Sequence, residues 1–300
     1  MLLVTLNHYV ADWISTNTKS SKINWLIEQP PPKADWVVLG SSAALASIDP
    51  AVLSSELGKD VLMLAEEGAA FPEQELIWKL LMERCRSKAL LLEVDAWGVT
   101  NVGYSWPFHE YHYLSHLNHP IVEKTLSEQK GPWLTAAWKY IPMLKFAQFN
   151  SKFGIVQLPS FLKGTSFDPR RAGTNETTAM IESLVEACET ELMTGWEWDR
   201  NRIDALEGIL ELAKANSVQV FLYYSPIYKS CRVHEEEKIK GFYRELAAKT
   251  NIPLIFIEDE SLLGQAENFK DITHMNSRGA HRFTKTIAER IKSTDLKATE

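Results

Sequence analysis

The chain has 300 residues, of which 45% are hydrophobic and 24% are charged. This composition is close to the average of globular proteins and argues against collagen-like, intrinsically disordered and disulfide-scaffold proteins. The 39 acidic residues exceed the 32 lysines and arginines, which gives a net charge of −7. Because a negative surface repels phosphate backbones, nucleic acid is not an expected partner.

The first 32 residues are set apart from the rest by three successive prolines, Pro30 to Pro32, which forbid a helix and favour an extended connector. The apolar start of the chain lacks a basic flank and a complete apolar core, so it does not qualify as a signal peptide. No stretch reaches the ~18 apolar residues that cross a bilayer. The segment 1–32 could be the remnant of a membrane anchor, which leaves the localisation open.

The domain that follows, residues 33–300, contains five short apolar runs that predict strands. These runs span residues 35–39, 61–65, 89–94, 218–224 and 253–257. Their hydrophobicity is continuous and does not alternate, which is typical of strands buried on both faces of a parallel sheet.

Segments with helical periodicity lie between and after these runs, at residues 73–86, 177–191, 202–215, 235–249 and 277–291. The alternation predicts an α/β fold, with a doubly wound, mainly parallel five-stranded sheet and helices on both faces. Ligands bind beyond the carboxyl ends of the strands in such folds. Residues from about 98 to 200 contain no convincing strand, so we expect a helical insertion there, with one helix at 133–149, that could cap the site.

Polar residues follow the first predicted strand, where Gly40, Ser41 and Ser42 precede a run of small residues. A serine at a strand-to-helix turn presents its hydroxyl at the carboxyl edge of the sheet, and backbone N–H groups of the turn can face a developing oxyanion. Ser42 is therefore a candidate nucleophile. A serine in this position can equally be a helix N-cap, so the motif alone does not decide.

A second polar stretch lies just before the last predicted helix and contains Asp271 and His274. A serine hydroxyl is a poor nucleophile until a base removes its proton. A histidine acts as that base when a carboxylate fixes its tautomer and stabilises the imidazolium. Asp271 and His274 can supply both partners from one turn. The alternative is that Asp271 caps a turn and His274 is a surface histidine.

These motifs resemble those of the SGNH (GDSL-like) hydrolase superfamily, particularly its branch of cell-surface acyl-transfer proteins, which includes the D-alanyl transfer protein DltD and the alginate O-acetylation proteins. The resemblance covers nearly the whole of residues 33–300. It rests on four motifs: Gly40-Ser41-Ser42, Leu64-Ala65-x-x-Gly68, Leu92-Glu93-Val94-Asp95-Ala96-Trp97 and Asp271-x-x-His274-x-Asn276-x-x-Gly279.

The resemblance implies a role for each matching residue. By position, Ser42 would be the nucleophile, His274 the base and Asp271 its orienting acid. The N–H groups of Ser42 and Gly68 would contribute to the oxyanion hole. Members of this branch carry an N-terminal membrane anchor and act outside the cytoplasm, so the resemblance also implies an extracytoplasmic or membrane-associated protein.

The chain departs from the family pattern at two points. Gly-Ser-Ser stands where the family usually has Gly-Asp-Ser. The acyl-transfer branch also has Gly-Ser-Ser at this position. The family's Gly-x-Asn-Asp block, which supplies an oxyanion donor, has no clear counterpart. Asn101, or a backbone group near Asp95, is the candidate for this missing donor.

Four histidines, spaced three, four and three residues apart, form a separate cluster: His109, His112, His116 and His119. On a helix they would share one stripe, and imidazoles at such spacing can bind zinc. The stretch lacks the H-E-x-x-H order, however, and bulky aromatic residues interrupt it. We therefore favour a polar, aromatic loop over a cleft, and expect neither a metal nor another cofactor.

The three cysteines, Cys85, Cys188 and Cys231, are odd in number and widely spaced. This pattern indicates neither a disulfide framework nor a cysteine-rich zinc site. We expect small buried apolar side chains at these positions.

Ten tryptophans are many for 300 residues, and several lie in the insertion or beside the proposed catalytic loops. Aromatic rings can cover the apolar C–H faces of sugars, so Trp97 and Trp106 are candidate substrate-binding residues for a glycan. The alternative is that these tryptophans are largely buried and serve packing.

The leading hypothesis is a serine-dependent esterase or O-acyltransferase that acts on small acyl esters, foremost acetyl, of a carbohydrate or cell-surface polysaccharide. Its partners would be such an ester or glycan and a membrane-associated polysaccharide-modification machinery. The second hypothesis is a non-catalytic glycan-binding or accessory protein that keeps the fold. A third is a metal-dependent hydrolase that uses the four histidines.

Overall fold

The computed structural model of the chain describes residues 2–18, 21–28, 33–102, 113–141, 144, 158–164, 166–171, 177–180 and 191–298. The chain divides into two compact units. Unit 1 comprises Met1–Pro32, Leu76–Arg84 and Trp106–Asp168, and unit 2 comprises Lys33–Glu75, Cys85–Ser105 and Pro169–Glu300. Of the predicted insertion, residues 106–168 therefore group with the N-terminal segment 1–32 in one unit.

Unit 1 is mainly helical in its described residues. Its elements are α1 (Leu2–Asn17), α2 (Lys22–Glu28), the 3-10 turn η2 (Leu114–His116), α7 (Pro120–Lys130), α8 (Pro132–Tyr140) and α11 (Leu158–Lys163), together with the part Leu76–Arg84 of α5 (Phe71–Arg84). The buried Asn24 amide donates hydrogen bonds to the carbonyls of Ser15 and Thr18, at 2.7 and 3.0 Å, which holds α2 against the end of α1. Among the described helices, none combines the length and the apolar character that a membrane crossing requires.

Unit 2 is built around a five-stranded sheet in which every neighbouring pair is parallel, with the order β2-β1-β3-β4-β5. The strands are β1 (Trp36–Leu39), β2 (Val61–Met63), β3 (Ala89–Val94), β4 (Gln219–Tyr224) and β5 (Leu254–Ile255). All lie within the five predicted runs. The α/β class and the parallel sheet expected from the continuous apolar runs are therefore confirmed.

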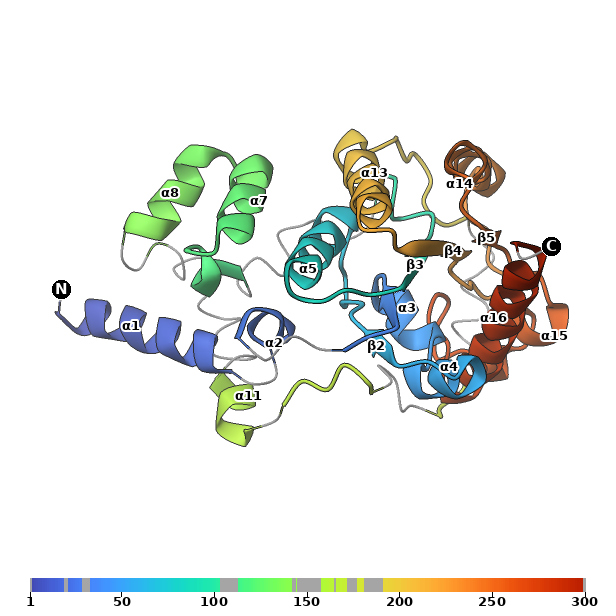
Figure 1. Cartoon of the computed structure of the whole chain (residues 1–300), viewed down its shortest axis with the longest axis horizontal. Coiled ribbons are helices and arrows are strands. Elements are labelled where there is room, and N and C mark those ends of the chain that lie inside the picture. Colours follow the sequence, from blue (N-terminus) through green and yellow to red (C-terminus); the bar gives the residue numbers. More distant parts are fainter. Residues whose placement is uncertain are drawn as a thin grey trace. The chain divides into compact units, whose positions relative to one another are not determined.

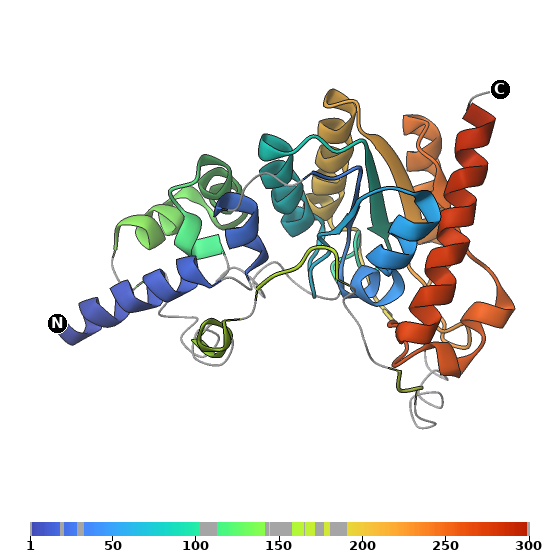
Figure 2. The same cartoon turned by 60° about the horizontal axis from the view of Figure 1, so that its bottom comes forward.

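The helices of unit 2 cover both faces of the sheet. They are α3 (Ser42–Ser47), α4 (Pro50–Leu57), α13 (Arg200–Ala215), α14 (Glu236–Thr250), α15 (Glu260–Leu263) and α16 (Ser277–Ala298), with the 3-10 turn η5 (Ala266–Asn268). Figures 1 and 2 show α13 on one face and α4 and α16 on the other. From α16, Phe283 and Ile287 are fully buried in the core against the sheet.

Helix α5 (Phe71–Arg84) follows β2 and agrees with the helix predicted at 73–86. Two other helix predictions fare less well. Residues 177–180 are not helical, and residues 181–190 lie outside the described part of the chain. Helix α8 ends at Tyr140, because Ile141 is extended (φ −99°, ψ 104°), and most of 141–149 lies outside the described residues.

The chain steps from β1 to β2 on one side and then returns across β1 to β3 on the other. Such a reversal leaves a crevice at the carboxyl ends of the two strands that flank it. A ligand site is therefore expected beyond the carboxyl ends of β1 and β3.

Gly279 lies in the first turn of α16, where the helix passes close to the backbone of η5. A Cβ atom added there would lie only 2.0 Å from the carbonyl oxygen of Asn268. Asn276 reinforces this contact, because its backbone N–H donates to the Asn268 carbonyl while its side-chain oxygen accepts from the Gly279 N–H. The Asn and Gly of the C-terminal motif thus fix where α16 begins.

We expect Gly279→Ala to lower the free energy of unfolding by about 1–3 kcal/mol, because the methyl group forces two backbone segments apart. Urea unfolding followed by circular dichroism measures this change. The matched control is Gly241→Ala in α14, where an added Cβ has no neighbour within 4 Å. Since alanine is the better helix former, the control should gain up to about 1 kcal/mol. Equal stability of both variants would contradict the argument.

Candidate active site

The turn after β1 places two serines at the carboxyl edge of the sheet. Ser41 is the N-cap of α3: its Oγ accepts a hydrogen bond from the Ala43 N–H at 3.1 Å. Ser42 is the first residue of the helix. Because Ser41 caps the helix, the hydroxyl of Ser42 is available for another partner. The alternative that Ser42 itself is the N-cap is therefore wrong.

A buried carboxyl group holds this turn from the neighbouring strand. Glu93, near the end of β3, accepts hydrogen bonds from the Ser41 N–H at 2.6 Å and from the Ser41 hydroxyl at 3.2 Å. Gly40 makes room for it, since a Cβ at this position would lie 2.5 Å from the Glu93 Oε2. The glycine of the first motif is needed for this close approach.

The loop between η5 and α16 carries the candidate acid and base. The Asp271 Oδ1 accepts the backbone N–H groups of Thr273 and His274, each at 3.0 Å, which makes a tight Asx-type turn. An antiparallel bridge between Phe269 and Met275 closes the loop at its base. The turn therefore presents the His274 ring in one direction.

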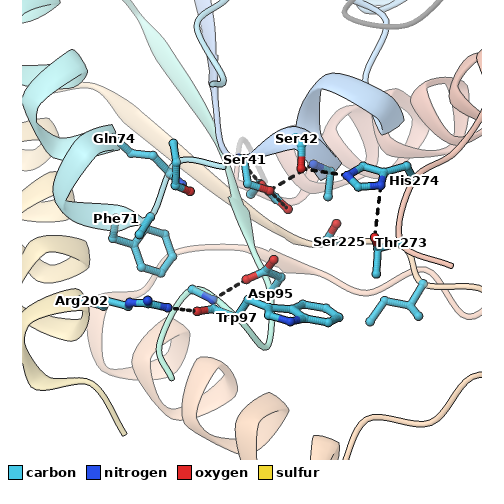
Figure 3. Close-up of a pocket in the computed structure, with 16 residues that line it drawn as sticks. Ser41, Ser42, Phe71, Gln74, Asp95, Trp97, Arg202, Ser225, Thr273 and His274 are labelled. Atoms are coloured by element: carbon cyan, nitrogen blue, oxygen red, sulfur yellow. Dashed lines mark hydrogen bonds between the residues drawn. The ribbon is translucent and has the colours of Figure 1, made fainter. Parts of the chain in front are cut away.

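The loop and the β1 turn meet across 232 positions of sequence. The His274 Nε2 lies 2.8 Å from the Ser42 Oγ, and its Nδ1 lies 2.8 and 2.9 Å from the two carboxylate oxygens of Asp271. Figure 3 shows Ser42 and His274 side by side at the rim of a pocket. An alcohol, an imidazole and a carboxylate are thus linked in the order that nucleophilic catalysis by serine requires.

Opposing effects act on the Asp271 carboxyl. Burial raises its pKa, but the hydrogen bond and charge of His274, together with the backbone N–H groups of the turn, outweigh burial and hold the pKa of Asp271 below its usual range. The carboxylate is therefore ionised at neutral pH and can hold the Nδ1–H tautomer of His274, which leaves Nε2 to accept the Ser42 proton.

The pocket beside Ser42 has a volume of about 210 Å³. Among its lining residues are Ser42 and His274, together with Phe71, Gln74, Glu93, Asp95, Trp97, Arg202 and Ser225. All of them belong to unit 2. Aromatic rings and buried polar groups therefore face the same small space as the candidate nucleophile.

The other predicted site residues differ in where they lie. Trp97 lines the pocket, whereas Trp106 lies outside the described residues. Gly68 has a left-handed backbone (φ 71°) in the turn before α5, and its neighbour Ala69, but not Gly68 itself, lines the pocket. Asn101 does not line the pocket, and its side-chain oxygen accepts the Glu197 N–H at 2.9 Å.

Sequence reasoning assigned no role to two acids in the pocket, Glu93 and Asp95. They stand two positions apart at the end of β3, where alternate side chains point to the same face. Their solvent-exposed fractions are 2% and 9%. Two carboxyl groups at this spacing, at the end of an otherwise apolar strand, are the signal that could have revealed them.

Burial and mutual repulsion disfavour ionisation of both acids at neutral pH. Burial raises the pKa of Glu93, and burial together with the nearby Glu93 raises the pKa of Asp95 to about 8. The Ser41 N–H, the Ser41 hydroxyl and the Ser225 hydroxyl all favour the charged form of Glu93. Asp95 has the Gly98 N–H, at 2.5 Å, and the Trp97 N–H. The proton that the pair retains is therefore assigned to Asp95.

The histidine cluster is only partly described, because His109 and His112 lie outside the described residues. The His116 Nε2 lies 2.6 Å from the Asn24 Oδ1, and the His119 Nε2 lies 3.2 Å from a Glu83 oxygen. Among the described residues, no group of three or more His, Cys, Asp or Glu side chains is arranged to hold a metal ion. Both described histidines therefore have structural partners within unit 1.

The cysteines differ from expectation at one position. Cys85 is free and buried, as predicted, whereas Cys231 is disulfide-bonded. Cys188 lies outside the described residues. The wide spacing misled the prediction, because segments far apart in sequence meet after folding.

No protein-family model matches the chain, and no curated protein sequence is significantly similar to it. Among solved structures, it is similar to a Bacteroides fragilis protein described as a candidate acylhydrolase. The two share 11% sequence identity, with a TM-score of 0.43, over 93% of this chain and 97% of the other. The function therefore has to be inferred from the geometry of the site.

The raised pKa of Asp95 predicts a pH-dependent stability. Between about pH 4 and pH 8 the carboxyl is protonated when folded and ionised when unfolded, so folding takes up a proton and stability falls as the pH rises. Asp95→Asn removes this dependence. Relative to wild type, the free energy of unfolding of the variant should rise by at most about 1.4 kcal/mol for each pH unit within this window. Above pH 8 the difference should stay constant.

Urea unfolding at pH 5, 6, 7, 8 and 9 measures this difference. The control is Asp49→Asn, at the N-cap of α4, where asparagine caps as well as aspartate. A stability difference between Asp95→Asn and wild type that stays constant with pH would rule out the raised pKa.

Proposed function

We propose that this protein is a serine-dependent esterase or O-acyltransferase that acts on small acyl esters, foremost acetyl esters, of a carbohydrate or cell-surface polysaccharide. The observation that carries the proposal is the chain of hydrogen bonds from the Ser42 Oγ through His274 to Asp271, at 2.8 Å and at 2.8 and 2.9 Å. These distances are within the range that proton transfer between nucleophile and base demands.

In the first step, the Ser42 Oγ attacks the acyl carbonyl carbon while the His274 Nε2 takes the hydroxyl proton. The tetrahedral adduct collapses as His274 returns that proton to the departing alcohol, which leaves an ester on Ser42. Asp271 stabilises the imidazolium through Nδ1–H. In the second step, His274 deprotonates a water or sugar hydroxyl, which attacks the ester and restores Ser42. Esterase and transferase differ only in this acceptor.

The lining of the pocket supports a carbohydrate ester. The Phe71 and Trp97 rings offer apolar faces to sugar C–H groups, while Gln74 and Asp95 offer polar atoms to hydroxyls. The volume of about 210 Å³ lies below the roughly 300–1,000 Å³ typical of sites for larger ligands, which supports a short acyl group.

Ser42→Ala should lower kcat on p-nitrophenyl acetate by on the order of 10⁴ or more, because the three triad residues act as a unit. The measurement is the initial rate, with spontaneous hydrolysis subtracted. A fluorophosphonate probe should label the wild-type protein at Ser42 and leave the variant unlabelled, as peptide mass spectrometry can show. Ser293→Ala, at an exposed serine of α16, is the control, and it should remain labelled at Ser42.

An unlabelled wild-type protein would instead favour the second candidate, a non-catalytic glycan-binding or accessory protein. The observation in its favour is that Asn101, the predicted oxyanion donor, does not line the pocket. Glycan binding without turnover would then be the outcome, and the serine mechanism would be wrong.

The small pocket predicts a preference for short acyl chains. The ratio of kcat/KM for p-nitrophenyl acetate to that for p-nitrophenyl octanoate should be about tenfold or more, because each methylene that finds no room loses apolar contact. Initial rates below the micelle concentration of the octanoate measure the ratio. Equal or faster turnover of the octanoate would contradict a site built for acetyl.

A further inference from the structure

The oxyanion that forms on the acyl oxygen can accept a hydrogen bond from the N–H of Ser42, the first residue of α3, but Gly68, the other expected backbone donor, does not line the pocket. The Ser41 N–H is bound to Glu93, and Asn101 does not line the pocket. The Gln74 side chain directs its amide nitrogen to the Ala69 carbonyl at 3.3 Å. Losing one oxyanion donor costs on the order of 10²–10³ in rate. An efficient esterase therefore needs a further donor that faces Ser42.

The Asp95 side chain is placed to be this donor. Figure 3 shows its carboxyl group in the pocket, below Ser42 and above the Trp97 ring. Asp95 is 9% exposed as a residue and lines the same cavity as Ser42 and His274. One oxygen accepts the Gly98 N–H, which fixes the orientation of the group. A carboxylic acid that stays neutral can donate a hydrogen bond to a developing negative charge.

Burial, and after it the nearby charge of Glu93, favour the neutral form of Asp95. Glu93, two positions before Asp95, repels a second negative charge. From α13, the positive Arg202 side chain is engaged elsewhere: its Nε lies 3.2 Å from a carboxylate oxygen of Asp199, and its Nη1 donates to the Trp97 carbonyl at 2.7 Å. Arg202 therefore offsets the repulsion only in part.

The other titratable groups near Asp95 come from β4, α14 and the catalytic loop. The pKa values of Tyr223, Tyr224 and Tyr243 are raised well above the usual value, mainly by burial, so these phenols are neutral. The Tyr243 hydroxyl donates to the backbone carbonyl of Asp95 at 2.7 Å. When His274 carries the proton taken from Ser42, its charge favours the ionised form of Glu93. Every neighbouring group is thus compatible with a proton on Asp95.

We propose that Asp95 supplies a second oxyanion donor beside the Ser42 N–H, its protonated carboxyl donating a hydrogen bond to the acyl oxygen of the substrate as Ser42 attacks. The proton stays on Asp95 throughout, and the bond strengthens as charge develops on the oxygen. This inference rests on the proposed function. It adds that a buried acid is the second oxyanion donor, a role for which an asparagine or a backbone group was expected.

The inference predicts how kcat/KM depends on the residue at position 95 and on the pH. Asparagine keeps a neutral N–H donor, whereas alanine removes it. At pH 7, Asp95→Ala should lower kcat/KM on p-nitrophenyl acetate by on the order of 10²–10³, and Asp95→Asn by less than about tenfold. Above pH 8 the wild-type rate should fall as Asp95 ionises, and this fall should be absent in Asp95→Asn.

The matched control is again Asp49→Asn, which should keep the wild-type rate and its alkaline fall. Two outcomes would overturn the inference: Asp95→Ala within about threefold of wild type, or Asp95→Asn as slow as Asp95→Ala although it remains folded. Should the alanine variant fail to fold, the rates of wild type and Asp95→Asn above pH 8 still test the inference. An equal fall of both rates would contradict it.

A measurement without turnover separates this inference from the proposed function. Carbon-13 NMR of the carboxyl groups should show one resonance that titrates near pH 8 in wild type and is missing in Asp95→Asn. An Asp95 carboxyl already ionised at pH 6 would overturn the inference even in an active enzyme. An unlabelled, inactive wild-type protein in which Asp95 titrates near pH 8 would instead refute the triad, and with it the donor role.

Discussion

The pocket depends on one buried carboxylate, that of Glu93. It takes the backbone N–H and the hydroxyl of Ser41, and so sets the turn from which Ser42 projects. The close approach requires a glycine at position 40. Burial raises the pKa of Glu93, the hydrogen bonds from Ser41 oppose this rise, and a charge on Glu93 disfavours a second charge on Asp95. The position of Ser42 and the proton on Asp95 therefore both depend on Glu93.

The parallel sheet and the meeting of Ser42 with His274 could be predicted because both follow from simple patterns. Runs such as Trp36–Leu39 are continuously apolar only when a strand is covered on both faces. Residues that follow parallel strands collect at one edge, so polar residues after the first strand and before the last helix tend to converge. The roles of serine, histidine and aspartate then follow from the chemistry of the groups.

The rest of the pocket could not be predicted from the same patterns. Which residue caps α3 depends on backbone angles that place Ser41, and not Ser42, over the Ala43 N–H. Asn101 was chosen for its amide group, but its orientation is set by a pairing with Glu197, 96 positions away in sequence. Arg202 reaches the pocket from α13 by an equally distant contact. Contacts of this kind leave no periodic signal in a sequence.

A buried, neutral acid that donates to the oxyanion would be useful in this pocket, because other groups of the site are exposed to water. The side chains of His274 and Asp271 are 20% and 39% exposed, so water reaches the triad and weakens the electrostatic effect of its charges. Asp95 lies deeper, where a hydrogen bond to a developing charge is stronger because less water competes for it. The acid and the base thus occupy different environments within one small pocket. That difference lets an ionised Asp271 and a protonated Asp95 coexist at neutral pH, and these are the forms that the proposed acyl transfer would require.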